Sequence, residues 1–255
     1  TGLQWSHYQT DGFPAKVNST IDNGYDNNSL HGYFQINDGQ RVIKTSIWSS
    51  SGTTEYMDFF LSPVSQDFDN IVSAINIKNP INDLWLSSLS LNLSKDKIDQ
   101  NNSADFNHSK KLSLEWQNNF QWNPSNEFII GYVHEKEEFD ASNYGLVVNT
   151  DLSSDAIYLE NLMLLDKHQL LIAMRLNNKE AIEDEDTWNL EYGYKVNTKI
   201  KFIINLGKAI RNPSNFDLYG FGGNQTLLPE VSNNKSIGVQ YTPNELGSIG
   251  LRFFE

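Results

Sequence analysis

The sequence predicts an all-β chain that forms part of an antiparallel, up-and-down transmembrane β-barrel. Three observations predict this fold class: apolar and polar residues alternate along the chain, short and long connections alternate between the strands, and no run of roughly 18 apolar residues occurs. The mean hydropathy of −0.50 is too polar for helical membrane spans. We count about thirteen strands, whereas single-chain bacterial barrels have an even number. We therefore expect strands to be missing from this sequence.

The alternation has a period of two, which places successive side chains on opposite faces of a strand. Three segments show it clearly, and their apolar sets are Trp188, Leu190, Tyr192, Tyr194 and Val196; Leu112, Leu114, Trp116, Phe120 and Trp122; and Ile200, Phe202, Ile204 and Leu206. The residues between them, such as Glu115, Asn189 and Asn205, are mostly polar. We expect the apolar faces to contact lipid and the polar faces to line a wet lumen.

The connections alternate in length as regularly as the strands alternate in polarity. Short turns are predicted at 37–40, 79–83, 123–127, 166–168, 197–198 and 243–246. Long polar connections are predicted at 10–28, 58–67, 98–109, 139–151, 179–186 and 211–234, and we interpret the charge runs EKEEFD and EAIEDED beside them as solvated loop. An outer-membrane barrel has short turns at one end and long loops at the other, which a soluble sandwich does not require.

Strand length and aromatic placement support the membrane interpretation. The predicted strands have roughly 9 to 12 residues, which suits a tilted bilayer crossing. Trp116 and Trp122 share one face and lie some 20 Å apart along a strand, close to the height of an apolar band with aromatic girdles. The alternative is that both side chains pack in the core of a soluble sandwich.

Composition excludes several function classes. The net charge of −13 argues against nucleic acid as a partner, because phosphate binding needs clustered Lys and Arg. The absence of Cys removes disulfides, zinc-thiolate sites and thiol catalysis. The five His residues are scattered, and neither HExxH nor GxSxG occurs, so we predict that the chain is not an enzyme.

The stretch DLYGFGGNQTLLPE at residues 217–230 is rich in glycine. It is not a phosphate cradle, because no Lys followed by Ser or Thr is present, and it lacks the alternating carboxylates of a calcium loop. Residues 211–241 resemble a segment of TonB-dependent outer-membrane receptors. The matching positions are Arg211, Pro213, Asp217, Leu218, Tyr219, Gly220, Gly223, Asn224, Leu227, Pro229, Glu230 and Ser232.

Residues 8–34 are similar to an early outer-loop hairpin of vitamin B12 (cobalamin) receptors within that family. The resemblance implies that residues 1–255 form one barrel segment in the bacterial outer membrane, without the N-terminal plug. It also implies energy-dependent uptake of cobalamin or a related corrinoid, with the TonB complex acting through the missing plug. The alternatives are a TonB-dependent siderophore receptor, a passive porin-like barrel and a soluble carbohydrate-binding protein.

The expected site residues lie in outer loops. Tyr25, Tyr219 and Phe221 are candidates for substrate contact, because rigid aromatic rings supply contact area at low entropic cost. In cobalamin receptors the matching hairpin supplies calcium ligands, so the resemblance implies that Asp11, Asp22 and Asp26 are candidate calcium ligands. The family's Asp-x-Asp-Gly pattern reads IDNG at 21–24, with one carboxylate absent. Asx-turns in a loop are the alternative interpretation of these residues.

Overall fold

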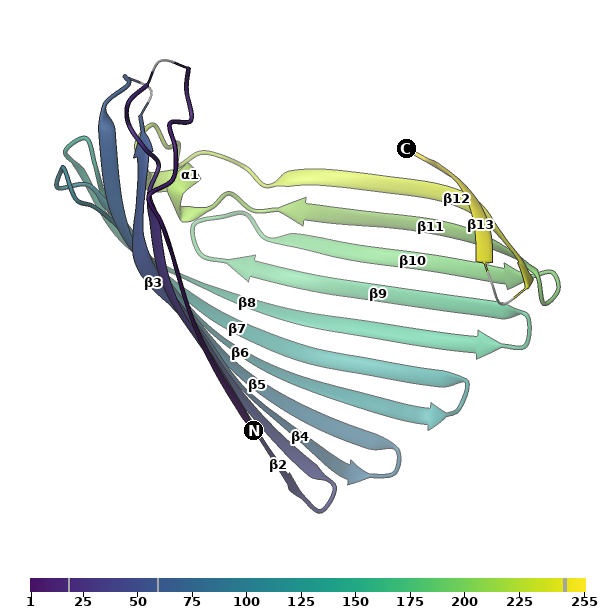
Figure 1. The fold of residues 1–255 in the computed structure, drawn as a ribbon. Helices are drawn as coiled ribbons and strands as arrows, with labels where there is room; N and C mark the ends of the chain where they lie inside the picture. Colours follow the sequence, from purple (N-terminus) through teal and green to yellow (C-terminus); the bar gives the residue numbers. More distant parts are fainter. Residues whose placement is uncertain (18, 59, 245–246) are drawn as a thin grey trace.

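The computed structural model contains one antiparallel sheet of 13 strands in sequence order, and it describes residues 1–17, 19–58, 60–244 and 247–255. Figure 1 shows the strands running side by side from β1 to β13. None of the helices among the described residues is long and apolar enough to cross a membrane. The elements are β1 Gly2–Thr10, β2 Tyr25–Asp38, β3 Arg41–Met57, β4 Pro63–Asn82, β5 Trp85–Gln100, β6 Phe106–Asn123, β7 Asn126–Asn143, β8 Leu146–Leu165, β9 His168–Lys179, β10 Glu185–Lys195, β11 Ile200–Arg211, α1 Asn215–Tyr219, β12 Glu230–Asn244 and β13 Gly247–Phe254.

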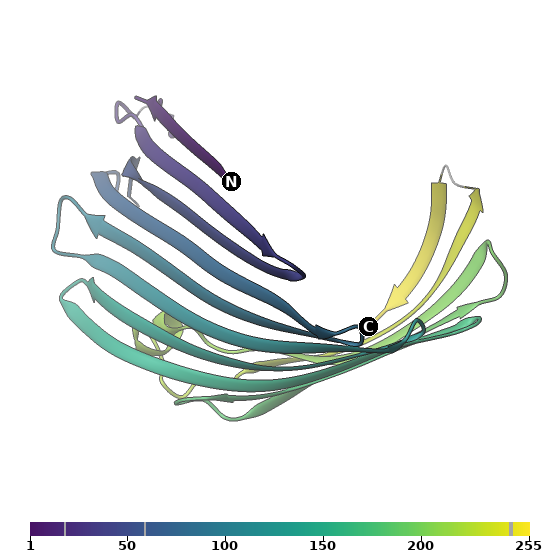
Figure 2. The same cartoon turned by 90° about the horizontal axis from the view of Figure 1, so that it is seen from below.

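The predicted up-and-down topology is confirmed. Each strand pairs with the next in the sequence, and the sheet curves into an open trough whose two edges are β1 and β13 (Figure 2). The sheet is not closed, because no pairing joins β1 to β13 in the part of the chain that the structure describes.

The register confirms the two predicted faces. Ile204 lies opposite Tyr192 on one side and Ile237 on the other, so apolar residues continue across three strands. Leu91 lies in the same way between Ile75 and Leu114. On the opposite face the Asn205 amide donates a hydrogen bond to the Asn189 carbonyl oxygen at 2.8 Å. The sheet therefore has one apolar face, left exposed, and one polar face.

The predicted strand lengths and long connections were partly wrong. β4 and β8 each have 20 residues, because polar segments interpreted as loop continue the backbone ladder. The segment 139–151, which includes part of the EKEEFD run, forms a hairpin whose turn is only Tyr144 and Gly145. Both turn residues have positive φ, at 51° and 82°, as a two-residue hairpin turn requires.

The β7–β8 turn lies at the same end of the sheet as the connections β1–β2 and β11–β12. These two connections are longer than the others at that end, and they comprise residues 11–24 and residues 212–229. At the opposite end the strands are joined by short turns, as predicted; of the turn at 243–246, residues 245 and 246 lie outside the described residues. The most buried apolar side chains gather on β7, β8 and α1: Val133, Phe139, Ala141, Leu152, Ala156 and Leu218.

Candidate functional site

The connection 212–229 carries a short helix with a complete capping box. The Ser214 hydroxyl accepts a hydrogen bond from the backbone N–H of Asp217, and the Asp217 carboxylate accepts one from the backbone N–H of Ser214. The Ser214 hydroxyl also lies 2.7 Å from the Asp217 carboxylate. These contacts with Ser214, its hydroxyl first and its backbone N–H second, hold the pKa of Asp217 below its usual range. The capping box fixes where the helix begins.

The DLYG part of this connection closes the helix tightly. Leu218 is the most buried large side chain among the described residues, at 2% exposed. A Cβ on Gly220 would lie 2.6 Å from the backbone oxygen of Phe216, so a larger residue does not fit there without a shift. The backbone N–H of Asn224 donates to the backbone oxygen of Asp217 at 2.8 Å and folds the following glycines back over the helix. The glycine-rich stretch is therefore an ordered barrel loop, as the sequence indicates.

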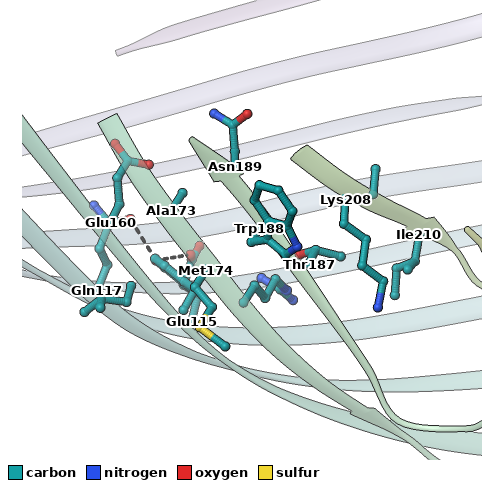
Figure 3. A pocket seen from close by; sticks show the side chains of 14 residues that line it. Glu115, Gln117, Glu160, Ala173, Met174, Thr187, Trp188, Asn189, Lys208 and Ile210 are labelled. Carbon is teal, nitrogen blue, oxygen red and sulfur yellow. Dashed lines mark hydrogen bonds between the residues drawn. The ribbon is translucent and has the colours of Figure 1, made fainter. Parts of the chain in front are cut away.

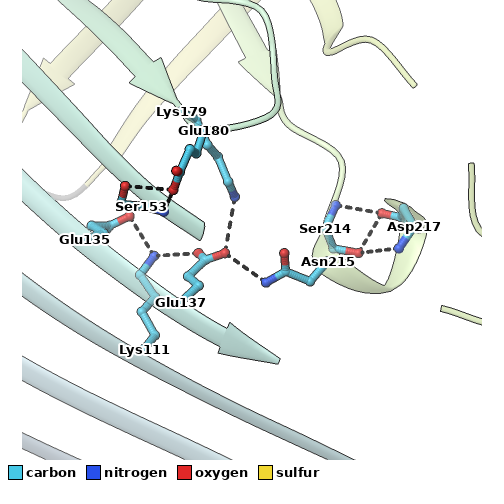
Figure 4. A network of polar contacts seen from close by, with 9 residues as sticks. All are labelled: Lys111, Glu135, Glu137, Ser153, Lys179, Glu180, Ser214, Asn215 and Asp217. Atoms are coloured by element: carbon cyan, nitrogen blue, oxygen red, sulfur yellow. Dashed lines mark hydrogen bonds and ion pairs between the residues drawn. The ribbon is translucent and has the colours of Figure 1, made fainter. Parts of the chain in front are cut away.

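A charged network ties this loop to the polar face of the sheet (Figure 4). Glu137 of β7 forms ion pairs with Lys179 at 3.2 Å and Lys111 at 3.5 Å, and Lys111 also contacts Glu135 at 2.8 Å. The side-chain amide of Asn215, in α1, donates to Glu137 Oε2 at 3.4 Å. Glu137 therefore contacts side chains of β6, β9 and the loop helix α1.

An exposed aromatic pair lies where two connections meet. The rings of Tyr144, in the β7–β8 turn, and Phe221, just after α1, have centroids 5.0 Å apart and are tilted by 54°. Both remain largely exposed, Tyr144 at 79% and Phe221 at 56%. Phe221 was a predicted site residue, whereas Tyr144 was missed because its segment was interpreted as a long loop. The signal that could have found it is the NYG triplet at 143–145, which suits a two-residue hairpin turn.

The other two predicted aromatic residues lie in different surroundings. Tyr219 is half-buried on α1. Tyr25 begins β2 and stacks on Phe68, with ring centroids 5.9 Å apart, while Tyr8 lies 6.1 Å from it. Tyr25 therefore belongs to a cluster on β1, β2 and β4, and no ring contact among the described residues joins that cluster to Phe221.

The three predicted calcium ligands line one hollow. Asp11, Asp22 and Asp26 surround a space of about 320 Å³ together with Glu55 of β3. Their oxygen atoms are hard donors of the kind that calcium takes. Across residues 1–17, 19–58, 60–244 and 247–255, however, no three acidic, His or Cys side chains lie close enough to hold one ion. The donor chemistry fits calcium, and the ligand role stays a prediction.

The polar face also lines a larger hollow of about 530 Å³ (Figure 3). The Tyr158 hydroxyl donates to Glu115 Oε1 at 2.7 Å and lies 2.9 Å from the side-chain oxygen of Gln117. The guanidinium of Arg175 lies 6.0 Å from the centre of the Tyr158 ring. This part of the sheet therefore presents a polar wall that carries both a carboxylate and a guanidinium.

Residues 1–255 match the family described as TonB dependent receptor-like, beta-barrel. The chain belongs to this family. The match covers every described strand and both long connections, and it confirms the resemblance that residues 211–241 carry. A TonB-dependent receptor barrel lies in the bacterial outer membrane. Barrels of this kind have an apolar outer face and a polar lumen, and the two faces of this sheet fit that arrangement.

Curated relatives of this receptor barrel include two proteins named vitamin B12 transporter. The protein from Photobacterium profundum is 24% identical over 242 residues, which are 91% of this chain and 39% of the relative. The protein from Vibrio vulnificus is 24% identical over 195 residues, which are 73% of this chain and 30% of the relative. The chain thus spans less than half the length of either relative.

Solved structures of siderophore receptors share this fold. The siderophore receptor PirA from Acinetobacter baumannii superposes with a TM-score of 0.82 at 16% identity, covering 99% of this chain and 47% of that one. A variant of the ferric enterobactin receptor from Pseudomonas aeruginosa gives 0.78 at 15% identity, covering 96% and 43%. At these identities the likeness shows the fold.

Proposed function

We propose that this chain forms barrel wall and outer loops of a receptor that captures a scarce nutrient and passes it through the lumen chemically unchanged. The observation that carries the proposal is the exposed pair of Tyr144 and Phe221. Phe221 follows a helix that is capped by Ser214 and Asp217 and tied to the barrel wall through Glu137. A pre-ordered aromatic surface loses little entropy when it binds a ligand.

The substrate that we propose is cobalamin or a related corrinoid. Two relatives that align over most of this chain are named vitamin B12 transporters, which supports this choice. A corrin ring is broad and flat, so aromatic rings from two connections offer it a large contact area. Siderophores are the second candidate substrate, because two of the solved receptors that share this fold are named as siderophore and ferric enterobactin receptors.

The proposed transport needs an energy source and a moving part. The family resemblance implies a plug domain outside residues 1–255, on which the TonB complex acts. The wet wall around Glu115, Tyr158 and Arg175 suits the path that a polar solute would follow once the plug moves. A passive porin-like barrel would share the strands but would lack the receptor motif at 211–232.

We also propose that calcium binds in the hollow lined by Asp11, Asp22 and Asp26 and draws these carboxylates together, because no three acidic side chains of the described residues already lie close enough to hold one ion. Glu55 lines the same hollow and would be a fourth oxygen donor. A bound divalent ion would offset the mutual repulsion of these carboxylates and order the 11–24 connection. Tyr25 adjoins this hollow, so the ion would also fix the start of β2. Tyr25 and Tyr219 remain proposed substrate contacts together with Phe221.

The experiment is a binding titration on the full-length receptor that carries this sequence, in detergent, with cyanocobalamin and with a ferric catecholate siderophore as probes. The proposal expects binding of cyanocobalamin that the double variant Tyr144→Ala/Phe221→Ala weakens at least tenfold. Trp122→Ala, at the short-turn end, is the matched aromatic control and should bind as the unchanged receptor does. Binding of the siderophore alone would contradict the cobalamin proposal.

A further inference from the structure

A group of aromatic and apolar side chains lies on the polar face of the sheet, about midway between its two ends. We call it the lumen patch, and its members are His31 and Tyr33 of β2, Trp48 of β3 and Val72 of β4. Trp48 lies directly opposite His31 on one side and directly opposite Val72 on the other. The patch therefore crosses three neighbouring strands.

The strand register places Trp48 on the polar face. Residues that lie directly opposite each other in an antiparallel pair point to the same side of the sheet. The row that starts at Trp48 runs through Val72, Ser94 and Lys111 to Glu137, which contacts the loop helix. A large ring on this face differs from the alternation in the rest of the sheet, where the apolar side chains lie on the other face.

The polar atoms of the patch have no partners within the protein. Tyr33 is 53% exposed and Trp48 is 40% exposed. Among the described residues, no side-chain hydrogen bond involves the ring nitrogens of His31, the hydroxyl of Tyr33 or the indole N–H of Trp48. The indole N–H of Trp116, on the apolar face, by contrast donates to Ser87 Oγ at 3.0 Å. The patch therefore offers both ring faces and free hydrogen-bonding groups.

The patch extends towards β1 through the ring of Tyr33. Gly2 lies opposite Tyr33 in the register, and a Cβ at Gly2 would clash with the ring of Tyr33. Glycine at this position therefore allows the ring to lie over β1. From β1 to β4 the patch covers three inter-strand spacings, or roughly 14 Å, which suits a broad, flat ligand.

The surroundings of the patch carry little charge. Among the described residues of β2, β3 and β4, the only charged side chains on this face are Lys44 and Lys78, both near the short turns. β6 and β7 form a charged sector of the same face, with Lys111, Glu115, Glu127, Glu135 and Glu137. A charged ligand that lost water at the patch would find no counter-charge there, so the patch favours an uncharged one.

We propose that the lumen patch is a second binding site for the nutrient and takes a flat, uncharged ring system with polar groups at its edge. The face of the ring system stacks on Trp48, and its edge groups form hydrogen bonds with His31 and Tyr33. Phe68, which stacks on the proposed substrate contact Tyr25, lies about 13 Å from Val72 along β4, towards the long connections. The patch thus continues the proposed outer contacts into the lumen.

This inference rests on the proposed function, because the ligand is the same nutrient. The first measurement is photo-cross-linking in cells that make the full-length receptor, with radiolabelled cyanocobalamin as the probe. Trp48→p-benzoylphenylalanine places the photoreactive group in the patch. Ser113→p-benzoylphenylalanine, on the charged sector of the same face, is the matched control. We expect at least fivefold more label at position 48 than at position 113, and only while the TonB complex works.

The second measurement compares uptake with binding. Trp48→Ala should slow energised uptake of cyanocobalamin at least threefold and leave the affinity of the resting receptor in detergent unchanged. Trp48→Phe keeps a ring and should retain uptake. In cells without a working TonB complex, Trp48→Ala should admit no more vancomycin than the unchanged receptor does, because the plug remains seated.

Uptake by the unchanged receptor with equal label at positions 48 and 113, or with none at position 48, would overturn this inference and leave the proposed function standing. An unchanged uptake rate in Trp48→Ala would do the same. Cross-links from position 48 to the plug alone, or increased vancomycin entry with Trp48→Ala, would show that the patch seats the plug and would also overturn it. A receptor that takes up no cyanocobalamin would overturn the proposed function and this inference together.

Discussion

The side-chain amide of Asn215 donates a hydrogen bond to Glu137 and joins the loop helix to a strand 78 residues earlier in the chain. Glu137 also forms an ion pair with Lys179, whose side chain is only 14% exposed. The position of the outer loop is therefore coupled to charges on the lumen wall. A loop held in this way presents Phe221 in a fixed place.

Replacing Glu137 with Gln should loosen this loop. The change leaves Lys179 without its carboxylate partner and weakens the contact with Asn215, at an expected cost of about 1–3 kcal/mol to local stability. Amides of residues 212–229 should then exchange hydrogen for deuterium faster in the refolded receptor. Glu183→Gln, on the exposed β9–β10 connection, is the control and should leave that exchange unchanged; similar rates in both variants would refute the anchoring role.

The two faces of β11 should respond differently to a charge. Phe202 is on the lipid-facing side and is 47% exposed, so Phe202→Arg should cost about 2–4 kcal/mol if it lies near mid-depth in the bilayer. Asn205→Arg places the same charge on the wet lumen side, beside Asn189, and should be tolerated. Guanidinium unfolding of receptors folded into liposomes measures both, and equal costs would reject the assigned faces.

Acidification should release the capping box. The pKa of Asp217 is lowered in the folded loop, so its ionised carboxylate stabilises the loop above the ordinary carboxyl pKa of about 3.9. This stabilisation is lost as the pH falls through the lower folded pKa. Ser214→Ala removes the contact with the hydroxyl, the largest cause of the shift, so it should raise the pKa of Asp217 towards the ordinary range. Carbon-13 NMR of labelled Asp carboxyls measures this pKa, and an unchanged value would contradict the assigned cause.

Calcium should bind to the hollow between β1, β2 and β3 and depend on its carboxylates. Asp22→Asn removes one charge from the proposed ligand set and should weaken calcium binding at least tenfold in a calorimetric titration of the full-length receptor. Asp38→Asn, at the end of β2 beside a short turn at the other end of the sheet, is the matched control. If unchanged receptor shows no calcium binding, Asp11, Asp22 and Asp26 are better explained as loop residues that form turns.

Much of the fold could be predicted from local sequence. The alternation in segments such as 187–196 shows which side chains share a face, because side chains in a strand alternate strictly. The count of thirteen strands and their order follow from turn signals between apolar runs. The strand ends at 139–151 could not be predicted, because a polar extension of a strand has the same kind of sequence as a polar loop.

The site was harder to predict because its contacts join distant parts of the chain. Phe221 could be proposed because it is an aromatic residue in an expected outer loop, but its partner Tyr144 depends on how the β7–β8 hairpin meets the α1 loop. Glu137 lies in a charge run that suggests a solvated loop, whereas the strand register turns it inward towards Lys111 and Lys179. Sequence spacing does not show such pairings.

The most direct test of the proposed function is growth rescue of a receptor-null strain by the full-length receptor that carries this barrel. We predict growth on limiting vitamin B12 that requires a working TonB complex and falls with Tyr144→Ala/Phe221→Ala. Rescue that is independent of the TonB complex, or rescue only on a ferric siderophore under iron limitation, would contradict the account.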